Sequence, residues 1–148
     1  MKPPNVLIVD DEVGPRESLK MILKPSFNTY TAEDGKEALE VIQRIPVDLV
    51  LLDLRMPGMS GEEVLKHVRG YDPTIEVVII TDYETLQSAL EAIKYNVFNF
   101  ILKPFDVPDV LSTVKRCIER RERATKIRKT SMDVDTDYDP PEGGLSTR

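Results

Sequence analysis

Short runs of consecutive apolar residues recur along the chain, and each run ends on a polar or charged residue. They cover residues 6–9, 49–52 and 77–80. A continuously apolar run bounded by turn residues is typical of a strand that is buried on both faces of a sheet. Residues 27–31 alternate and are rich in aromatic and β-branched side chains, which predicts a strand nearer the sheet edge. Residues 98–102 predict the last strand.

Segments with a helical period separate these runs. Asp34 with Glu37, and Ser60 with Glu63, have the spacing of a capping box at the start of a helix. The alternation of five strands with five helices predicts an α/β fold, with a parallel sheet, right-handed crossovers and helices on both faces. The apolar positions expected to face the core are Leu19, Ile22, Leu23, Ala38, Leu39, Ile42, Ile45, Val64, Leu65, Val68, Leu86, Ala89, Leu90, Ile93, Val110, Leu111, Val114 and Ile118.

The ends of several helices are also marked. Gly70 predicts the end of the third helix, and Asn96 stands where a left-handed residue would end the fourth. Asp106 predicts the N-cap of the fifth helix. Beyond Ile118 the apolar stripe fades, and residues 119–129 hold six basic and two acidic side chains.

We therefore divide the chain into a folded domain over residues 1–120, a charged helical extension or linker over 121–130 and a disordered tail over 131–148. The charged run is more typical of a solvated helix end or a linker. The alternatives are the start of a signalling helix into an output domain, and a surface for an acidic partner.

Composition argues against several classes of function and location. The 148 residues carry a formal charge of −6, which argues against direct binding of nucleic acid by this segment. The single cysteine, Cys117, excludes an internal disulfide and indicates a structural side chain in a reducing compartment. The first apolar run is too short for a signal peptide or a membrane span, so we expect a cytoplasmic protein with no membrane contact. His67 has no metal-ligand partner at suitable spacing and is expected on the surface.

Several predicted strands end on residues suited to chemistry. These residues are Asp10, Asp11, Glu12, Asp53, Thr81 and Lys103. The C-terminal ends of parallel strands share one edge, where these side chains converge if the strand order reverses between the first and third strands. Converging carboxylates need a cation, and Mg²⁺ prefers oxygen ligands. Together with a lysine and a hydroxyl that can bind an anion, they indicate phosphoryl transfer to an aspartate.

Each of these residues also has a simpler interpretation. Asp53 alone could cap the following turn, and Asp10 with Asp11 could lie in a solvated loop. The combination with Thr81 and Lys103 favours the functional interpretation.

The chain resembles the receiver domain of two-component response regulators over about residues 5–118. The motifs that carry the resemblance are residues 9–12, 52–61, 80–81 and 100–105. The resemblance implies a flavodoxin-like, chemotaxis-regulator-like fold with a five-stranded parallel sheet in the order 2-1-3-4-5.

The resemblance also implies roles at the site. Asp53 would accept a phosphoryl group from a sensor histidine kinase or a phosphotransfer protein. Mg²⁺, with Mn²⁺ as a substitute, would be bound by Asp11, Asp53 and the backbone carbonyl of Arg55, with Asp10 acting through water. The chain would be an enzyme only in catalysing its own phosphorylation and dephosphorylation.

The resemblance also implies that further residues respond to phosphorylation. Lys103 would contact the phosphate and Asp53, and the Lys103–Pro104 bond is expected to be cis. Thr81 would move towards the phosphate and Phe100 would turn inward, although an aromatic residue in a sheet is more often simply core. These movements would remodel a face formed by the fourth helix, fifth strand and fifth helix, through which a homodimer could form.

Some positions depart from the family pattern. Asp82 follows Thr81 where a small residue is usual, and its charge could repel phosphate or hinder Thr81. Phe100 replaces the commoner tyrosine. Arg55 and Tyr83, each two residues after a site residue, are large enough to shield an aspartyl phosphate from water.

Two alternatives to a working receiver remain open. The first is a degenerate receiver that binds or dimerises without phosphate, with Asp82 spoiling the site. The second is an aspartate-dependent phosphatase of another α/β family, which ranks last because residues 10–12 lack the spacing of its nucleophile motif. No output domain is recognisable, so the chain is expected to be either a stand-alone receiver or the receiver portion of a longer regulator.

Overall fold

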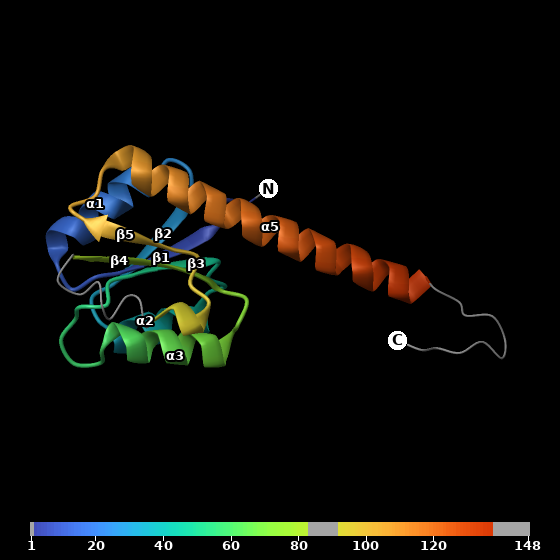
Figure 1. Ribbon diagram of the computed structural model, residues 1–148, viewed down its shortest axis with the longest axis horizontal. Helices are drawn as coiled ribbons and strands as arrows, with labels where there is room; N and C mark the ends of the chain where they lie inside the picture. Colours follow the sequence, from blue (N-terminus) through green and yellow to red (C-terminus); the bar gives the residue numbers. More distant parts are fainter. Residues whose placement is uncertain (1, 83–91, 138–148) are drawn as a thin grey trace.

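The computed structural model describes the backbone of residues 2–82 and 92–137, and the side chains of residues 2–82 and 93–128. Its centre is a five-stranded parallel sheet in the order β2-β1-β3-β4-β5 (Figure 1). The strands are β1 (Asn5–Val9), β2 (Asn28–Ala32), β3 (Leu49–Leu52), β4 (Glu76–Asp82) and β5 (Asn99–Lys103). The predicted fold class and strand order are confirmed.

Helices cover both faces of the sheet, with α1 and α5 on one face and α2 and α3 on the other (Figure 1). The helical elements are α1 (Val13–Leu23), α2 (Gly35–Arg44), α3 (Gly61–Tyr71), the 3₁₀ helix η2 (Ala92–Tyr95) and α5 (Val107–Asp137). Most of the fourth helix predicted from the sequence, including Leu86, Ala89 and Leu90, lies outside the described residues.

The central strands are continuously apolar because helices cover both faces of the sheet. Every residue of β3 is buried, and its side chains alternate between two cores. Val50 and Leu52 pack with α2 and α3, whereas Leu49 and Leu51 pack with α1 and α5. Apolar side chains are therefore needed at every position, which is why this strand shows no alternation in the sequence.

Local signals at the helix ends are largely confirmed. The Asp34 side chain accepts a hydrogen bond from the Glu37 N–H at 2.8 Å, and the Ser60 side chain accepts one from the Glu63 N–H at 3.2 Å. Asn96 has a left-handed backbone, with φ of 60°.

The predicted end of the third helix at Gly70 is wrong, because α3 continues through Tyr71. The helical hydrogen bonding runs on to Asp72, whose N–H donates to the Val68 carbonyl at 2.9 Å. Gly70 lies inside this last turn and does not adopt the left-handed conformation that would end a helix.

Helix α5 is much longer than its apolar stripe. It begins after Asp106, whose side chain accepts the Asp109 N–H at 2.8 Å, and it continues to Asp137. Its far half projects from the domain (Figure 1). The predicted disorder therefore starts too early, since residues 131–137 are helical. No proline or glycine occurs between Pro108 and Pro140, so no helix-breaking residue ends the helix at residue 131.

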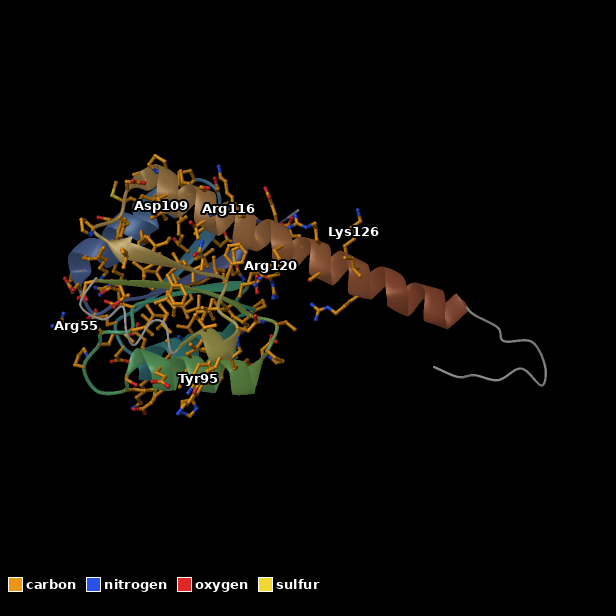
Figure 2. The ribbon with its side chains drawn as sticks, viewed as in Figure 1. Arg55, Tyr95, Asp109, Arg116, Arg120 and Lys126 are labelled. Carbon is orange, nitrogen blue, oxygen red and sulfur yellow. The ribbon has the colours of Figure 1, made fainter. Side chains whose placement is uncertain are left out.

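Two arginines in the charged part of α5 are bound to the N-terminal edge of the sheet. Arg120 donates to both carboxylate oxygens of Glu76, at 2.8 and 2.9 Å, and lies over the Phe98 ring at 4.6 Å. Arg121 donates to Asp48 at 3.0 Å. These hydrogen bonds anchor α5 to the domain at Arg120 and Arg121, whereas residues 123–128 are exposed (Figure 2). Among the described helices, none is both long and apolar enough to cross a membrane.

Candidate functional site

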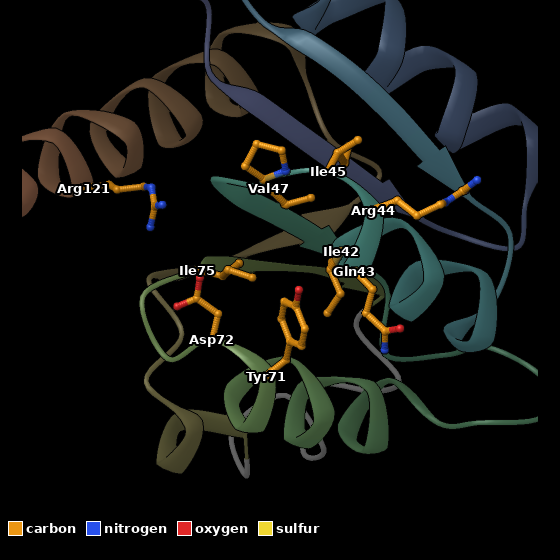
Figure 3. Close-up of a pocket in the computed structure, with 10 residues that line it drawn as sticks. Ile42, Gln43, Arg44, Ile45, Val47, Tyr71, Asp72, Ile75 and Arg121 are labelled. Carbon is orange, nitrogen blue, oxygen red and sulfur yellow. The ribbon is translucent and has the colours of Figure 1, made fainter.

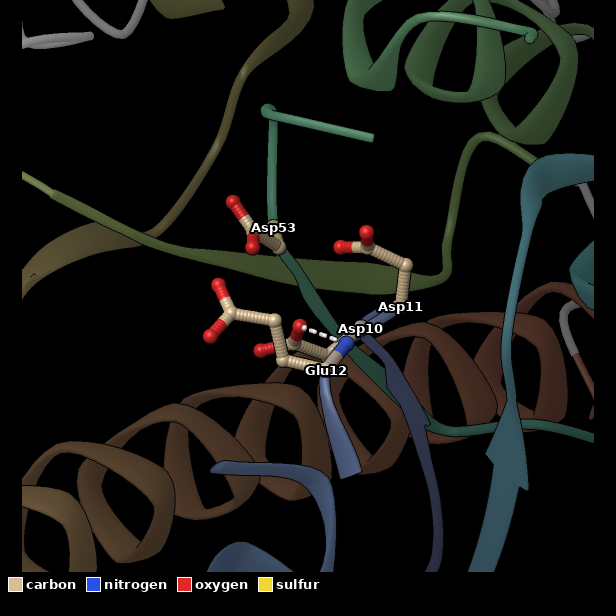
Figure 4. Close-up of side chains that lie close together, drawn as sticks. All are labelled: Asp10, Asp11, Glu12 and Asp53. Carbon is tan, nitrogen blue, oxygen red and sulfur yellow. Dashed lines mark hydrogen bonds between the residues drawn. The ribbon is translucent and has the colours of Figure 1, made fainter. Parts of the chain in front are cut away.

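Four carboxylates gather at the C-terminal edge of the sheet (Figure 4). They belong to Asp10, Asp11, Glu12 and Asp53, and each offers one oxygen atom within 4.8 Å of the others. Asp10 and Asp53 are buried, whereas Asp11 and Glu12 are exposed. This edge of the sheet therefore carries a concentrated negative charge, with two of its carboxylates buried and two exposed to solvent.

The register of the sheet explains this convergence. Val9 of β1 pairs with Leu52 of β3, so the next residues of both strands, Asp10 and Asp53, lie side by side. The Asp53 N–H continues the ladder by donating to the Val9 carbonyl at 3.0 Å. Each aspartate also fixes its own loop. Asp10 Oδ1 accepts the Glu12 N–H, and Asp53 Oδ1 accepts the Arg55 N–H, both at 2.9 Å.

Lys103, at the end of β5, reaches both buried carboxylates. Its Nζ lies 2.7 Å from Asp10 Oδ2 and 2.9 Å from Asp53 Oδ2. Burial alone would lower the pKa of Lys103, but the hydrogen bonds with these two carboxylates outweigh it and raise the pKa. The lysine therefore stays charged at the site.

The environment of Asp53 opposes its negative charge. Burial raises the pKa of Asp53 above its ordinary 3.8, and the neighbouring Asp10 acts in the same direction. The Arg55 N–H and Lys103 offset only part of this effect. A buried carboxylate with a raised pKa beside a fixed lysine is a common feature of functional sites.

The remaining predicted site residues lie around this centre. Thr81 is fully buried near the end of β4, directly before Asp82. Phe100 is half-buried and packs against the α2–α3 core. The Lys103–Pro104 bond is cis. Tyr83 lies outside the described residues.

The donor set suits a hard divalent cation. Carboxylate oxygens from several side chains within a few ångströms are the ligands that Mg²⁺ and Mn²⁺ prefer. One lysine does not neutralise four carboxylates, so a cation bound at the exposed rim would relieve their repulsion. The residues present therefore fit the predicted metal.

Two relationships at the site were missed in the sequence. Lys103 is shared with Asp10, whereas the sequence analysis assigned it to Asp53 and the phosphate alone. Arg55 Nη1 forms an ion pair with Asp82 Oδ2 at 2.8 Å. The sequence places these opposite charges close to the ends of two predicted strands, but it does not show that the two side chains meet.

A hollow of about 370 Å³ lies away from these carboxylates, between the ends of α2 and α3 and the side of α5 (Figure 3). Tyr71 and Arg121 both line it. Two of its charged groups already have partners: Arg121 binds Asp48, and Asp72 accepts hydrogen bonds from the N–H and hydroxyl of Thr74. It offers no counterpart of the acidic cluster, which remains the candidate site.

Fold and site together define an α/β domain with an acidic cluster and a lysine at the C-terminal edge of its parallel sheet, and comparison with known proteins identifies its family. The sequence model of the response regulator receiver domain matches residues 6–115 of the 148. The chain belongs to the response regulator receiver family. This membership leaves no support for the alternative of a phosphatase from another family.

Similarity to individual proteins supports this family membership. The chain is 37% identical over 112 residues to the sporulation initiation phosphotransferase F of Bacillus subtilis (strain 168), covering 75% of this chain and 90% of that protein. It is 32% identical over 134 residues to the regulatory protein AtoC of Escherichia coli (strain K12), covering 90% of this chain but only 29% of AtoC. The crystal structure of a CheY-like receiver domain protein from Methanospirillum hungatei JF-1 superimposes with a TM-score of 0.79 at 26% identity, covering 83% and 99% of the two chains.

Proposed function

We propose that Asp53 accepts a phosphoryl group from a phosphohistidine on a sensor kinase or phosphotransfer protein, and that this modification switches an interaction surface. The observation that carries the proposal is the position of the Asp53 carboxylate. It is buried at the sheet edge, held by the Arg55 N–H and Lys103 and surrounded by three further carboxylates.

In the proposed step, a carboxylate oxygen of Asp53 attacks phosphorus as the bond from phosphorus to the histidine nitrogen breaks. The histidine, protonated beforehand on its other ring nitrogen, leaves as the neutral imidazole with the electron pair of the broken bond, and an acyl phosphate forms on Asp53. Lys103 supports this step because its ammonium already lies beside the nucleophile and remains charged. Its charge would stabilise the negative oxygens of the transferred group.

The proposed metal ligands are Asp11, Asp53 and the carbonyl of Arg55, with Asp10 acting through water. When bound there, Mg²⁺ would neutralise the carboxylates and the phosphoryl oxygens. Thr81 and Phe100 are proposed to respond to the phosphate. Thr81 is fully buried one residue before the end of β4, and Phe100 pairs with Ile79 in the adjacent strand.

The chain spans under a third of AtoC but most of the sporulation phosphotransferase. Both a stand-alone receiver and the receiver portion of a longer regulator are therefore compatible with its relatives. We propose the cytoplasm as its location. Dimerisation through the face of the fourth helix, β5 and α5 remains a prediction, as does the absence of direct nucleic-acid binding.

The test is phosphorylation of the purified chain by acetyl phosphate, read by intact mass. We expect a mass gain of one phosphoryl group that requires Mg²⁺ and is absent from Asp53→Asn. Lys103→Ala should slow the reaction by roughly 100-fold or more, the usual cost of removing a group that stabilises developing charge. No mass gain under conditions where Mg²⁺ demonstrably binds would instead support a degenerate receiver.

A further inference from the structure

The Arg55 side chain pairs with Asp82 at the mouth of the acidic site. Arg55 Nη1 lies 2.8 Å from Asp82 Oδ2, and the two side chains are 59% and 35% exposed. Both line an open hollow of about 300 Å³. The other residues around it are Asp11, Glu12, Met56 and Pro57. Any group that approaches the exposed carboxylates through this hollow therefore passes the pair.

Arg55 connects the two segments that carry the proposed nucleophile and hydroxyl. Its N–H donates to Asp53 Oδ1 at 2.9 Å, and its guanidinium reaches Asp82 at the end of β4. Asp82 directly follows Thr81. The pair thus spans the entrance from the β3 side to the β4 side.

The charges around the entrance are unbalanced. Within the described part of the chain, five carboxylates gather here: Asp10, Asp11, Glu12, Asp53 and Asp82. Lys103 is engaged in the interior by Asp10 and Asp53. Among the residues that the structure describes, the Arg55 guanidinium is the cation paired with Asp82 at the rim. Without it, the Asp82 carboxylate would add to the repulsion of an incoming anion.

The stability of the fold gives little reason for such a pair, because exposed ion pairs contribute little to folding. Their charges do act on ligands that approach through a cleft with one dominant sign. We propose that the Arg55–Asp82 pair sets the electrostatic potential at the mouth of the site, and thereby the rate at which anionic phosphodonors enter. This inference rests on the proposed phosphoryl transfer to Asp53.

The first test is the initial rate of phosphorylation by acetyl phosphate, at low donor concentration and with Mg²⁺ saturating for each variant. Arg55→Ala should be about three- to tenfold slower at low salt, Asp82→Ala faster, and the double variant close to the wild type. These differences should shrink in about 1 M salt, where the screening length falls to about 3 Å. A purely steric effect would persist in salt.

The second test uses Mg²⁺ alone and needs no phosphoryl transfer. The same potential acts with opposite sign on a cation. Arg55→Ala should therefore bind Mg²⁺ more tightly by about two- to fivefold, and Asp82→Ala more weakly. Opposite effects on the anionic donor and on the cation distinguish a change of potential from damage to the site.

Glu62 and Lys94 provide a matched control pair. They lie 3.9 Å apart and are 36% and 64% exposed, close to the values for Asp82 and Arg55, but they do not line the hollow. Lys94→Ala and Glu62→Ala change the net charge of the protein equally and should leave both measurements unchanged.

A double variant as slow as Arg55→Ala alone would overturn the inference, as would equal effects from Lys94→Ala. If the wild type takes up no phosphate but the Mg²⁺ shifts occur, the proposed function fails while the assigned role in the potential stands. If phosphorylation proceeds and the variants match the wild type in both measurements, only the role of the pair fails.

Discussion

The ammonium nitrogen of Lys103 lies 2.9 Å from a carboxylate oxygen of Asp53, although 50 positions separate the two residues in the chain. The same nitrogen lies 2.7 Å from Asp10. One cation is therefore shared by two buried carboxylates, with Asp11 and Glu12 close by. Without a bound metal, the cluster works against folding.

The first prediction follows from this imbalance. Asp53→Asn should raise the free energy of unfolding by about 1 kcal/mol at pH 7 without divalent cations, because it removes a poorly compensated buried charge. Lys103 keeps Asp10 as a partner. Urea unfolding would measure the change, with the exposed Glu40→Gln as the control.

The gain from Asp53→Asn should depend on pH. The pKa of Asp53 is raised in the folded state, so its ionisation costs stability at pH values above that pKa. The cost shrinks as the pH falls through the raised value and is gone below the ordinary 3.8, where both states are protonated. The stabilisation should therefore be largest near neutral pH and shrink in acid. A gain that grew in acid would contradict the assignment.

The sequence predicted the sheet because its strands are buried on both faces and their ends are marked by chemistry. Leu49–Leu52 followed by Asp53 specified both a strand and its functional end. The side-chain pairs that cross between elements were harder to predict. Arg120 with Glu76, and Arg55 with Asp82, depend on which strand ends and helix turns meet in space, and local pattern carries no such information.

Errors at the ends of helices have a similar origin. Glycine is common where helices end, yet α3 continues past Gly70 because its hydrogen bonds run on to Asp72. The extension of α5 through residues 131–137 was missed because polar composition was interpreted as disorder. A helix in progress adds residues at little cost, so composition alone locates its end poorly.

The second prediction concerns two glycines of α3. A Cβ on Gly61 would overlap the backbone of Leu54 and lie 2.9 Å from the Asp53 carbonyl oxygen, whereas at Gly70 nothing lies within 4 Å. Gly61→Ala should destabilise the fold by about 1–3 kcal/mol, because backbone must shift beside the site. Gly70→Ala should stabilise it by about 0.5–1 kcal/mol through helix propensity. Thermal unfolding of both variants would measure these changes, and equal effects would contradict the packing described for Gly61.

The third prediction concerns the anchoring of α5. Arg120→Ala leaves the buried Glu76 carboxylate without its bidentate partner and removes the guanidinium from the Phe98 ring. We expect a loss of about 1–3 kcal/mol, less than for a fully buried pair because the Arg120 side chain is 42% exposed. Chemical denaturation would measure it.

Two further variants isolate the cause of that loss. Glu76→Gln in the Arg120→Ala background should recover part of the stability, since no buried charge is then left unpaired. Arg116→Ala serves as the control, because the Arg116 side chain is exposed on the same helix. A loss in Arg116→Ala equal to that in Arg120→Ala would point to helix propensity as the cause.

The fourth prediction concerns hydrogen exchange along α5. Val110, Val114 and Cys117 are buried, whereas residues 123–128 are exposed. Amides up to about Arg121 should exchange as slowly as the core, and those of residues 123–128 should exchange at least about 100-fold faster, because these residues are exposed. Mass spectrometry of peptides from both halves would measure this. Uniform protection that increases with protein concentration would show that the far half is covered by self-association.

The anchoring of α5 at Arg120 and Arg121 also has a mechanical consequence. Some 16 residues follow Arg121 within the helix, a length of about 24 Å at the usual rise per residue. This half of the helix would pivot about the edge of the sheet to which Arg120 and Arg121 are bound. A tilt of only about 5° at this edge would displace the far end of the helix by about 2 Å over this length. A small change in the packing beneath α5 would therefore produce a larger displacement at the far end of the helix and of any partner bound there.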